Sequence, residues 1–314
     1  MDAGYESYFV RAADPVGGRG FWIRYTVHRK EGHAPAGSLW FTFFDARRPP
    51  QAVKTTVPDL QAGDGAWLRI AGAEIGPGRA RGAIEVPEAD PVGWDLSFEG
   101  APLHAHLPGG WMYDAPLPRT KPVSLHPAAR LRGSLVLGDL VVDVDGWPGM
   151  VGHNWGSEHA ERWIWLHGSG FGEDPDSWLD VVLARLRIGR WTTPWSGFGA
   201  LCLDGRTRRF GGLSRVRSTR VDEHADRLAF SMTGDDLRVH GTVSAPLERF
   251  VGWEYADPDG SSHDVAHCSI ADLEVTLEEK DLPPRTLRAA GTAAYELGMR
   301  EHDHGLFIQP FPDG

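Results

Sequence analysis

The stretch from Trp147 to Asp180, WPGMVGHNWGSEHAERWIWLHGSGFGEDPDSWLD, decides how the chain is interpreted. Seven of the 13 tryptophans of the chain fall between Trp147 and Trp195, with histidines and carboxylates among them. Protein cores are built mostly from smaller aliphatic side chains, so large aromatic rings beside titratable groups indicate the wall of a binding site. A tryptophan-rich core with satisfied polar groups is the alternative.

Strand geometry in this stretch predicts an aromatic box. In a strand, alternate residues share a face, so Trp163, Trp165 and His167 would point to one side. In a following strand, Trp178 and Asp180 would share a face. Placed side by side, the two faces would enclose one imidazole and one carboxyl group. The segment 153–156 (HNWG) is expected to be a turn that adds another imidazole and indole.

The rest of the chain predicts an all-β fold. Short segments rich in aromatic and β-branched residues, bounded by Gly, Pro or Asp, recur in both halves. In the segment 21–28 (FWIRYTVH), one face is apolar and the other holds Trp22, Arg24, Thr26 and His28. We expect two antiparallel β-barrels or sandwiches, formed by residues 1–157 and 158–314.

Two segments depart from the strand pattern. The composition changes between residues 107 and 127, and the run 107–118, whose prolines lack a backbone donor, is expected to form a long crossing loop. Residues 157–162 are expected to form one or two helical turns, with Ser157 as N-cap and Arg162 paired with Glu158.

Charge and composition limit the partners. The chain has 314 residues and a net charge of −11, which argues against nucleic acid and anionic membranes. The N-terminus lacks the regions of a signal peptide, and no apolar run approaches the ~20 residues of a membrane helix. We therefore expect a cytoplasmic protein without stable membrane insertion, whose partner is an apolar small molecule. The sequence does not indicate the oligomeric state.

The aromatic box suits acid–base chemistry on a double bond. A carboxylic acid in an apolar pocket has a raised pKa and can deliver a proton near neutral pH. The resulting positive charge would be stabilised by indole faces, by about 0.5–2 kcal/mol each. Asp180 is the candidate acid, and His153 would orient it or activate water. Water capture gives a hydratase, an internal nucleophile a cyclase, and proton loss an isomerase. An ordinary ion pair of Asp180 with Arg185 or Arg187 is the alternative.

The segment GHNWG at 152–156, followed by an aromatic strand, resembles a known superfamily. The superfamily contains carotenoid 1,2-hydratase (hydroxyneurosporene synthase), the AttH proteins and, more distantly, tocopherol cyclase. The resemblance implies two lipocalin-like β domains with a ligand cavity. It also implies that the matching positions His153, Trp155, Trp178 and Asp180 form the catalytic set. This chain departs from the pattern in having Gly152 where an acidic residue is typical, and Trp178 where the hydratases have Tyr.

We therefore predict a cofactor-independent enzyme that acts on an unsaturated apolar molecule, such as an isoprenoid or polyketide. The predicted catalytic residues are Asp180 and His153. The predicted substrate-binding residues are Trp155, Trp163, Trp165, His167, Trp178 and Asn154.

No metal is expected, because the histidine spacings match no zinc site. The pairs His104/His106 and His302/His304 would each place two imidazoles on one face if extended.

Two other function classes share the expected fold. A carrier or sensor would bind a lipid-like ligand without chemistry, and a structural interaction module would have no cavity. The enzyme is favoured over the carrier if Asp180 and His153 face a cavity within hydrogen-bond reach of each other.

Overall fold

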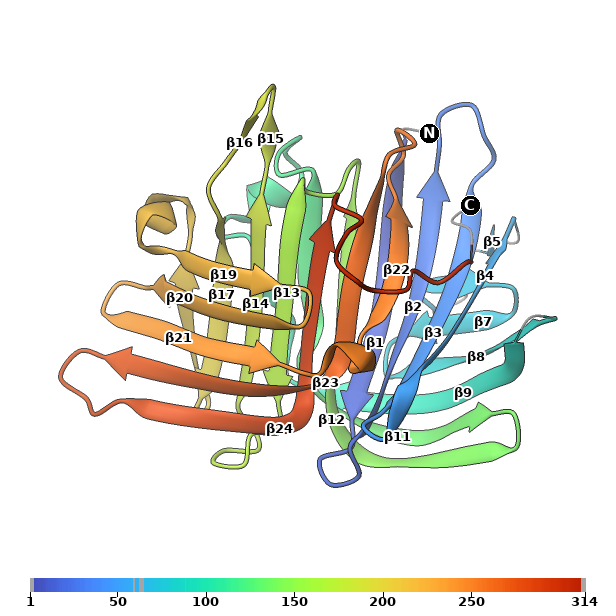
Figure 1. The fold of residues 1–314 in the computed structure, drawn as a ribbon, viewed down its shortest axis with the longest axis horizontal. Helices are drawn as coiled ribbons and strands as arrows, with labels where there is room; N and C mark the ends of the chain where they lie inside the picture. Colours follow the sequence, from blue (N-terminus) through green and yellow to red (C-terminus); the bar gives the residue numbers. More distant parts are fainter. Residues whose placement is uncertain (1–2, 59, 62–64, 88, 312–314) are drawn as a thin grey trace.

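The protein is nearly all β-strand and forms two large antiparallel sheets and one small hairpin, which confirms the predicted fold class. The computed structural model describes residues 3–58, 60–61, 65–87 and 89–311. Figure 1 shows the two large sheets beside each other.

The first sheet is built from the strands of the N-terminal half. These are β1 (Gly4–Ala13), β2 (Arg19–Arg29), β3 (Ala36–Asp45), β4 (Arg48–Val57), β5 (Leu60–Gln61), β6 (Leu68–Ile70), β7 (Ala73–Gly76), β8 (Arg79–Val86), β9 (Ala89–Gly100), β10 (His104–Ala105), β11 (Thr120–Leu137) and β12 (Leu140–Gly156). The short 3-10 helix η1 (Gly110–Tyr113) lies between β10 and β11.

The second sheet is built from the C-terminal half. Its strands are β13 (Arg162–Ser169), β14 (Trp178–Arg185), β17 (Ser196–Leu203), β18 (Arg206–Gly211), β19 (Arg220–His224), β20 (Arg227–Thr233), β21 (Leu237–Ser244), β22 (Val251–Ala256), β23 (Ser262–Glu279) and β24 (Arg285–Met299). The hairpin is β15 (Arg187–Ile188) and β16 (Trp191–Thr192), and the remaining 3-10 helices are η2 (Leu213–Ser218) and η3 (Leu247–Arg249).

Both sheets are wound in the same way. The first sheet has the order β4-β3-β2-β1-β12-β11-β9-β8-β7-β6-β5, with β10 on β11. The second has the order β18-β17-β14-β13-β24-β23-β21-β20-β19, with β22 on β23. In each, the first strand pairs with the last strand of the same half, so β1 meets β12 and β13 meets β24. The two halves are thus structural counterparts, although no short sequence repeat is visible.

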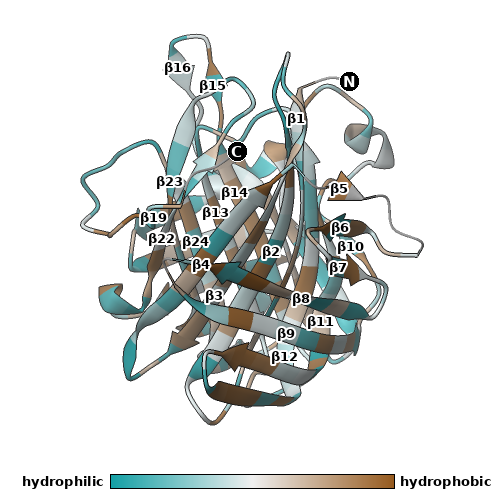
Figure 2. Cartoon of the chain, turned by 90° about the vertical axis from the view of Figure 1, so that its right-hand side faces the viewer, coloured by the Kyte–Doolittle hydropathy of each residue, from teal (hydrophilic) through white to brown (hydrophobic). Residues whose placement is uncertain are grey.

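The central strands of the first sheet are buried on both faces. Along β2, Phe21, Ile23 and Tyr25 pack in the core of the first half, as the alternation predicts, and Val27 is buried. The opposite, mixed face turns toward the second sheet, where Trp22 packs against that sheet's residues. At the outer strands β8 and β9, polar and apolar residues follow one another along the chain (Figure 2).

The second sheet turns an aromatic and polar face toward the first. On β13, Ile164 and Leu166 enter the core of the second half, whereas Trp165 packs edge-to-face on Phe9 of β1. We call the facing side chains of β1, β2, β3, β11 and β12 and of β13, β14, β22, β23 and β24 the inter-sheet layer. This layer holds most of the candidate residues.

The run 107–118 contains no strand and only the short η1, and β11 begins just after it, at Thr120. Two other local expectations are wrong. The segment 153–156 is not a turn but the end of β12. Residues 157–161 form no helix, and Arg162 pairs with Glu223 and Glu301. Glu158 pairs instead with Arg119.

The predicted division at residues 157 and 158 stays a prediction, although strands up to β12 belong to the first sheet and those from β13 to the second or the hairpin. Among the residues described, none of the helices has the length and apolar character to cross a membrane.

Candidate functional site

The Asp180 carboxylate lies at the centre of the inter-sheet layer and is fully buried. Its Oδ1 accepts a hydrogen bond from the Trp165 indole at 3.3 Å, and its Oδ2 accepts one from the Ser124 hydroxyl on β11. The Nε2 atom of His106 lies 3.3 Å from the same Oδ2 and 3.1 Å from Ser124 Oγ. Of the predicted box, Trp165 and Asp180 are in direct contact, and Ser124 of β11 and His106, which follows β10, join them.

The two ring nitrogens of His106 differ in their contacts among the described residues. Nε2 donates toward Asp180 and Ser124, because both oxygens there are acceptors for it. Nδ1 is buried and has no hydrogen-bond partner among the described residues. A carboxylate that fixes one nitrogen of a histidine leaves the other available for proton transfer, which is the arrangement of general acid–base histidines.

Two aromatic neighbours stand beside this pair. The His104 ring centre lies 5.0 Å from that of His106 and 5.3 Å from that of Trp178. Burial, together with the charge of His106, lowers the pKa of His104 to about 4, so His104 is neutral near pH 7. It packs against the pair without adding a positive charge.

Asp180 is not a raised-pKa acid, which corrects the sequence-based expectation. Burial acts to raise its pKa, but the neighbouring His106 and His167 and the Ser124 hydrogen bond outweigh it. The pKa therefore lies below its usual range and the group is ionised. The alternative ion pair is not formed either, because Arg185 bonds the Thr193 carbonyl and Arg187 pairs with Glu161.

His167 stands opposite Asp180 in the β13–β14 register. Its Nε2 donates to the Pro127 carbonyl at 2.8 Å, so Nδ1 is the acceptor that faces Arg11 at 3.4 Å. Burial and the charge of Arg11 lower the pKa of His167 to about 4. This neutral imidazole has both nitrogens engaged, so it supports the site without a free nitrogen of its own.

Trp163 lies at a second carboxylate of the layer. Its indole donates to Glu296 Oε1 at 3.0 Å, and Glu296 Oε2 accepts from Tyr255 at 3.2 Å and contacts His267 Nδ1 at 3.1 Å. Burial opposes ionisation of Glu296, yet these donors hold its pKa below the usual range. The ring centres of His267 and Trp165 are 6.0 Å apart. Trp165 therefore contacts Asp180 directly and Glu296 through His267.

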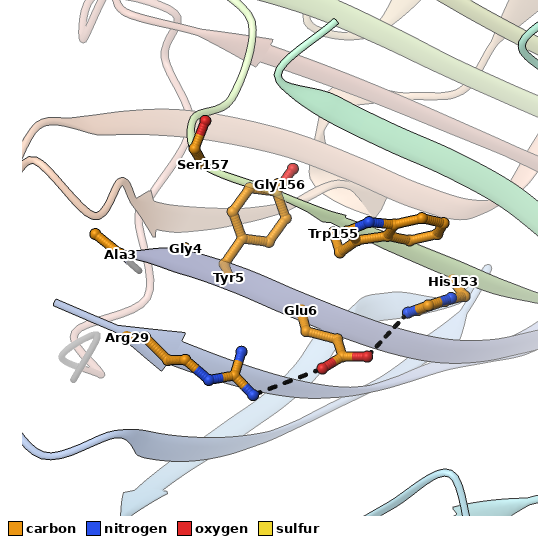
Figure 3. A pocket seen from close by; sticks show the side chains of 9 residues that line it. All are labelled: Ala3, Gly4, Tyr5, Glu6, Arg29, His153, Trp155, Gly156 and Ser157. Carbon is orange, nitrogen blue, oxygen red and sulfur yellow. Dashed lines mark hydrogen bonds and ion pairs between the residues drawn. The ribbon is translucent and has the colours of Figure 1, made fainter. Parts of the chain in front are cut away.

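His153 lies in a different place from Asp180. It stacks on Tyr8 at 4.0 Å and on Trp155 at 4.6 Å, and its Nε2 lies 3.3 Å from Glu6 Oε1. In Figure 3, Glu6 stands between His153 and Arg29 at an open cleft of about 360 Å³. Trp155 also lines this cleft.

The alternation of β12 separates the two predicted catalytic residues. Gly152 pairs with Ser124, whose hydroxyl reaches Asp180, so the next residue, His153, points to the other face of the sheet. His153 therefore does not orient Asp180, and His106 contacts the carboxylate instead. Whether His153 has a catalytic role stays a prediction.

Gly152 and Asn154 face the layer, whereas Trp155 shares the face of His153. Asn154 is on the same face as Gly152, and its Oδ1 is buried without a partner in the described part of the chain. A Cβ atom on Gly152 would lie 2.2 Å from the Phe9 ring, so no acidic side chain fits at this position.

No group of three or more metal-binding side chains is found within the described ranges. His302 and His304 both contact Asp264 Oδ2 at 2.8 Å, near the surface.

Sequence reasoning missed His106 and Ser124 as partners of Asp180. The pair His104/His106 was visible as a possible two-imidazole face, but no strand was predicted through Ser124. Ser124 is on β11, and His106 directly follows β10, which pairs with β11.

Comparisons with known proteins support the fold. No protein-family model matches the chain. Two uncharacterized proteins of Mycobacterium tuberculosis, Rv0493c of strain H37Rv and MT0513 of strain CDC 1551, are each 28% identical over 302 residues, covering 94% of this chain and 86% of theirs.

Two crystal structures are similar over nearly the whole chain. A putative AttH from Nitrosomonas europaea has a TM-score of 0.58 at 14% identity, covering 96% of this chain and 93% of that chain. Kievitone hydratase from Nectria haematococca has a TM-score of 0.57 at 10% identity, covering 94% and 88%. The chain thus has the fold of AttH and kievitone hydratase, and the resemblance found in its sequence is confirmed at the level of fold.

Proposed function

We propose that the protein is a cofactor-independent acid–base enzyme that adds water to an unsaturated, largely apolar small molecule in the inter-sheet layer. The observation that carries the proposal is the buried Nδ1 of His106, free of a partner in the described chain, while Asp180 and Ser124 hold Nε2. A histidine nitrogen without a partner, on a ring that a carboxylate orients, suits proton transfer to carbon.

The reaction balances with these residues alone. Protonated His106 gives its Nδ1 proton to one carbon of the double bond, and the other carbon becomes positive. Water attacks that carbon, and its released proton returns to Nδ1. Asp180 stabilises the imidazolium form of His106, as a buried carboxylate does in other acid–base histidine pairs. The net change is the addition of one water molecule.

The indoles give this chemistry an apolar, cation-stabilising wall. Trp165 is fixed because its N–H is bound to Asp180, and Trp178 packs on His104. A ring face near the developing charge contributes about 0.5–2 kcal/mol. The shared fold with kievitone hydratase favours hydration over cyclisation or isomerisation as an analogy, since one fold hosts many reactions.

A carrier is the second candidate. It is favoured by the separation of His153 from Asp180 and by the open cleft at His153 and Glu6, which could receive a ligand without chemistry.

The test uses kievitone, named by the structural relative, as the probe. The protein is incubated with kievitone in isotopically labelled water, and products are measured by mass spectrometry. The proposal expects incorporation of one labelled oxygen by the wild type and by Asp143→Asn, an exposed carboxylate control. It expects loss with His106→Gln and Asp180→Asn. Equal incorporation by all four proteins would refute the assignment of His106 and Asp180.

A further inference from the structure

We infer that the ligand of the inter-sheet layer carries an acceptor oxygen (a carbonyl, phenolic or carboxylate oxygen) that is bound by Arg24 and the indole N–H groups of Trp40 and Trp253. The ligand is therefore an oxygenated unsaturated molecule and not a pure hydrocarbon. This inference rests on the proposed function only in taking the layer as the substrate site.

Arg24 is a buried cation held mainly by neutral groups. It is 4% exposed, and its Nε donates to the Ser7 hydroxyl at 2.6 Å. The guanidinium carbon lies 4.1 Å from the Tyr255 ring centre and 5.4 Å from that of Trp40. Within the described ranges, no carboxylate lies within ion-pair distance of it. A buried guanidinium is stable only with acceptors around it, and its planar fork suits oxygen acceptors.

Trp40, which lies against Arg24, is one of several residues of the first and second sheets with an unused donor. The indole nitrogens of Trp40 and Trp253 are buried without a hydrogen-bond partner in the described chain, and so are the hydroxyls of Thr26 and Thr42. An indole N–H can only donate, so each of these two buried N–H groups is satisfied only by an acceptor atom. The rings of Trp40 and Trp253 meet edge-to-face at 5.1 Å, so the two tryptophans are direct neighbours.

The carboxylate of the second sheet does not satisfy these donors. Glu296 is already engaged by Trp163, Tyr255 and His267. Arg24 acts on it only over a longer distance, as one of the smaller influences that lower the pKa of Glu296. The described part of the chain therefore supplies no acceptor to the two indoles, and we assign that acceptor to the bound molecule.

Trp40 is connected to the proposed reacting pair through a series of ring contacts, edge-to-face, tilted and stacked. The Trp22 ring lies 6.4 Å from Trp40 and 4.9 Å from His267, and His267 lies 6.0 Å from Trp165. Trp165 in turn binds Asp180. An extended ligand with its oxygen at Arg24 would therefore lie along an aromatic surface with its double bond toward His106.

The experiment compares three compounds with one carbon skeleton: farnesene, farnesal and farnesoic acid. Dissociation constants are measured by equilibrium dialysis, which does not depend on tryptophan fluorescence. We expect farnesal and farnesoic acid to bind at least about tenfold more tightly than farnesene, because one desolvated hydrogen bond contributes about 1–2 kcal/mol. Equal affinities for the three, or no binding of the two oxygenated compounds, would overturn the inference.

Variants locate the oxygen. Trp40→Phe and Trp253→Phe remove an N–H and keep an aromatic ring, so the preference for the oxygenated compounds should shrink. Trp94→Phe is the matched control, because the Trp94 indole is buried on the other face of the first sheet and already bound to Tyr25. Arg24→Gln should weaken farnesoic acid more than farnesal if the bound group is charged. An unchanged preference in Trp40→Phe, Trp253→Phe and Arg24→Gln would contradict the assignment.

One further variant, His106→Gln, distinguishes a failure of this inference from a failure of the proposed function. His106→Gln should bind the oxygenated compounds like the wild type, because it removes only the proton-transfer group. If the oxygenated compounds bind more tightly than farnesene but none is hydrated, the inference about the acceptor oxygen is supported and the hydratase proposal fails.

Discussion

The Nε2 atom of His106 and the Oδ2 atom of Asp180 lie 3.3 Å apart in the layer between the two sheets. The histidine follows a short strand on the first sheet, and the carboxylate is central on the second. The pair exists only when the two halves are packed together. Chemistry at this pair therefore depends on the contact between the sheets.

Removing either partner of the pair should abolish most of the turnover. His106→Gln and Asp180→Asn are expected to lower kcat by about 10²–10⁴-fold, the usual contribution of a positioned acid–base group. The measurement is the rate of hydration of an identified substrate, with Asp143→Asn as the exposed control. Wild-type rates in both variants would remove the pair from the mechanism.

His153→Ala should affect stability more than turnover. The variant loses the stacks on Tyr8 and Trp155, which corresponds to about 1 kcal/mol of unfolding free energy. Because His153 faces the cleft and not Asp180, kcat should stay within about tenfold of the wild type. Urea unfolding and turnover check the two parts. A loss of kcat as large as that of His106→Gln would restore His153 to the catalytic set.

Stability should fall as the pH drops from about 6.5 to about 4. The pKa of His167 is lowered to about 4 in the folded state, so the unfolded chain binds more protons in this window and is favoured as the pH falls. The loss due to His167 is at most about 3 kcal/mol, since one pKa unit corresponds to about 1.4 kcal/mol. The depressed pKa of Asp180 adds a further loss only near and below its ordinary value of 3.8.

Denaturant unfolding at several pH values checks this expectation. His167→Gln should flatten the curve between pH 6.5 and 4, because the substituted side chain does not titrate. An identical slope in the wild type and the variant would show that His167 is not held neutral.

Arg11 should act as a cross-link between the sheets. From β1 its Nη2 donates to the carbonyls of Ser269 and Thr292 on the second sheet, at 2.5 and 2.9 Å. Arg11→Ala would leave these acceptors and His167 without a donor, at a cost of about 3–5 kcal/mol. Arg79→Ala, which breaks an exposed pair with Asp95, should cost at most about 1 kcal/mol. Similar midpoints of urea unfolding for both variants would contradict this role.

The sequence predicted which side chains of one strand share a face better than it predicted their contacts with residues of other strands. The alternation of β13 and β14 correctly places Trp165 and Asp180 together, because side-chain direction in a strand is a local property. Which face of β12 meets the second sheet is a tertiary property, so His153 was assigned to the wrong side. Bulges in β11 near His126 also shift the alternation, which hid Ser124.

The expectation that Asp180 has a raised pKa is wrong for a related reason. Apolar surroundings alone would raise it, and the sequence showed only those surroundings. The donors that lower it, His106 and Ser124, come from the other sheet.

The most direct test of the account is mass spectrometry of the apolar compounds extracted from purified wild-type protein and from Asp180→Asn produced in the same host. The account predicts a different compound on each protein, with the wild-type compound heavier by one water. The same compound on both proteins would contradict the proposed hydration and favour a carrier.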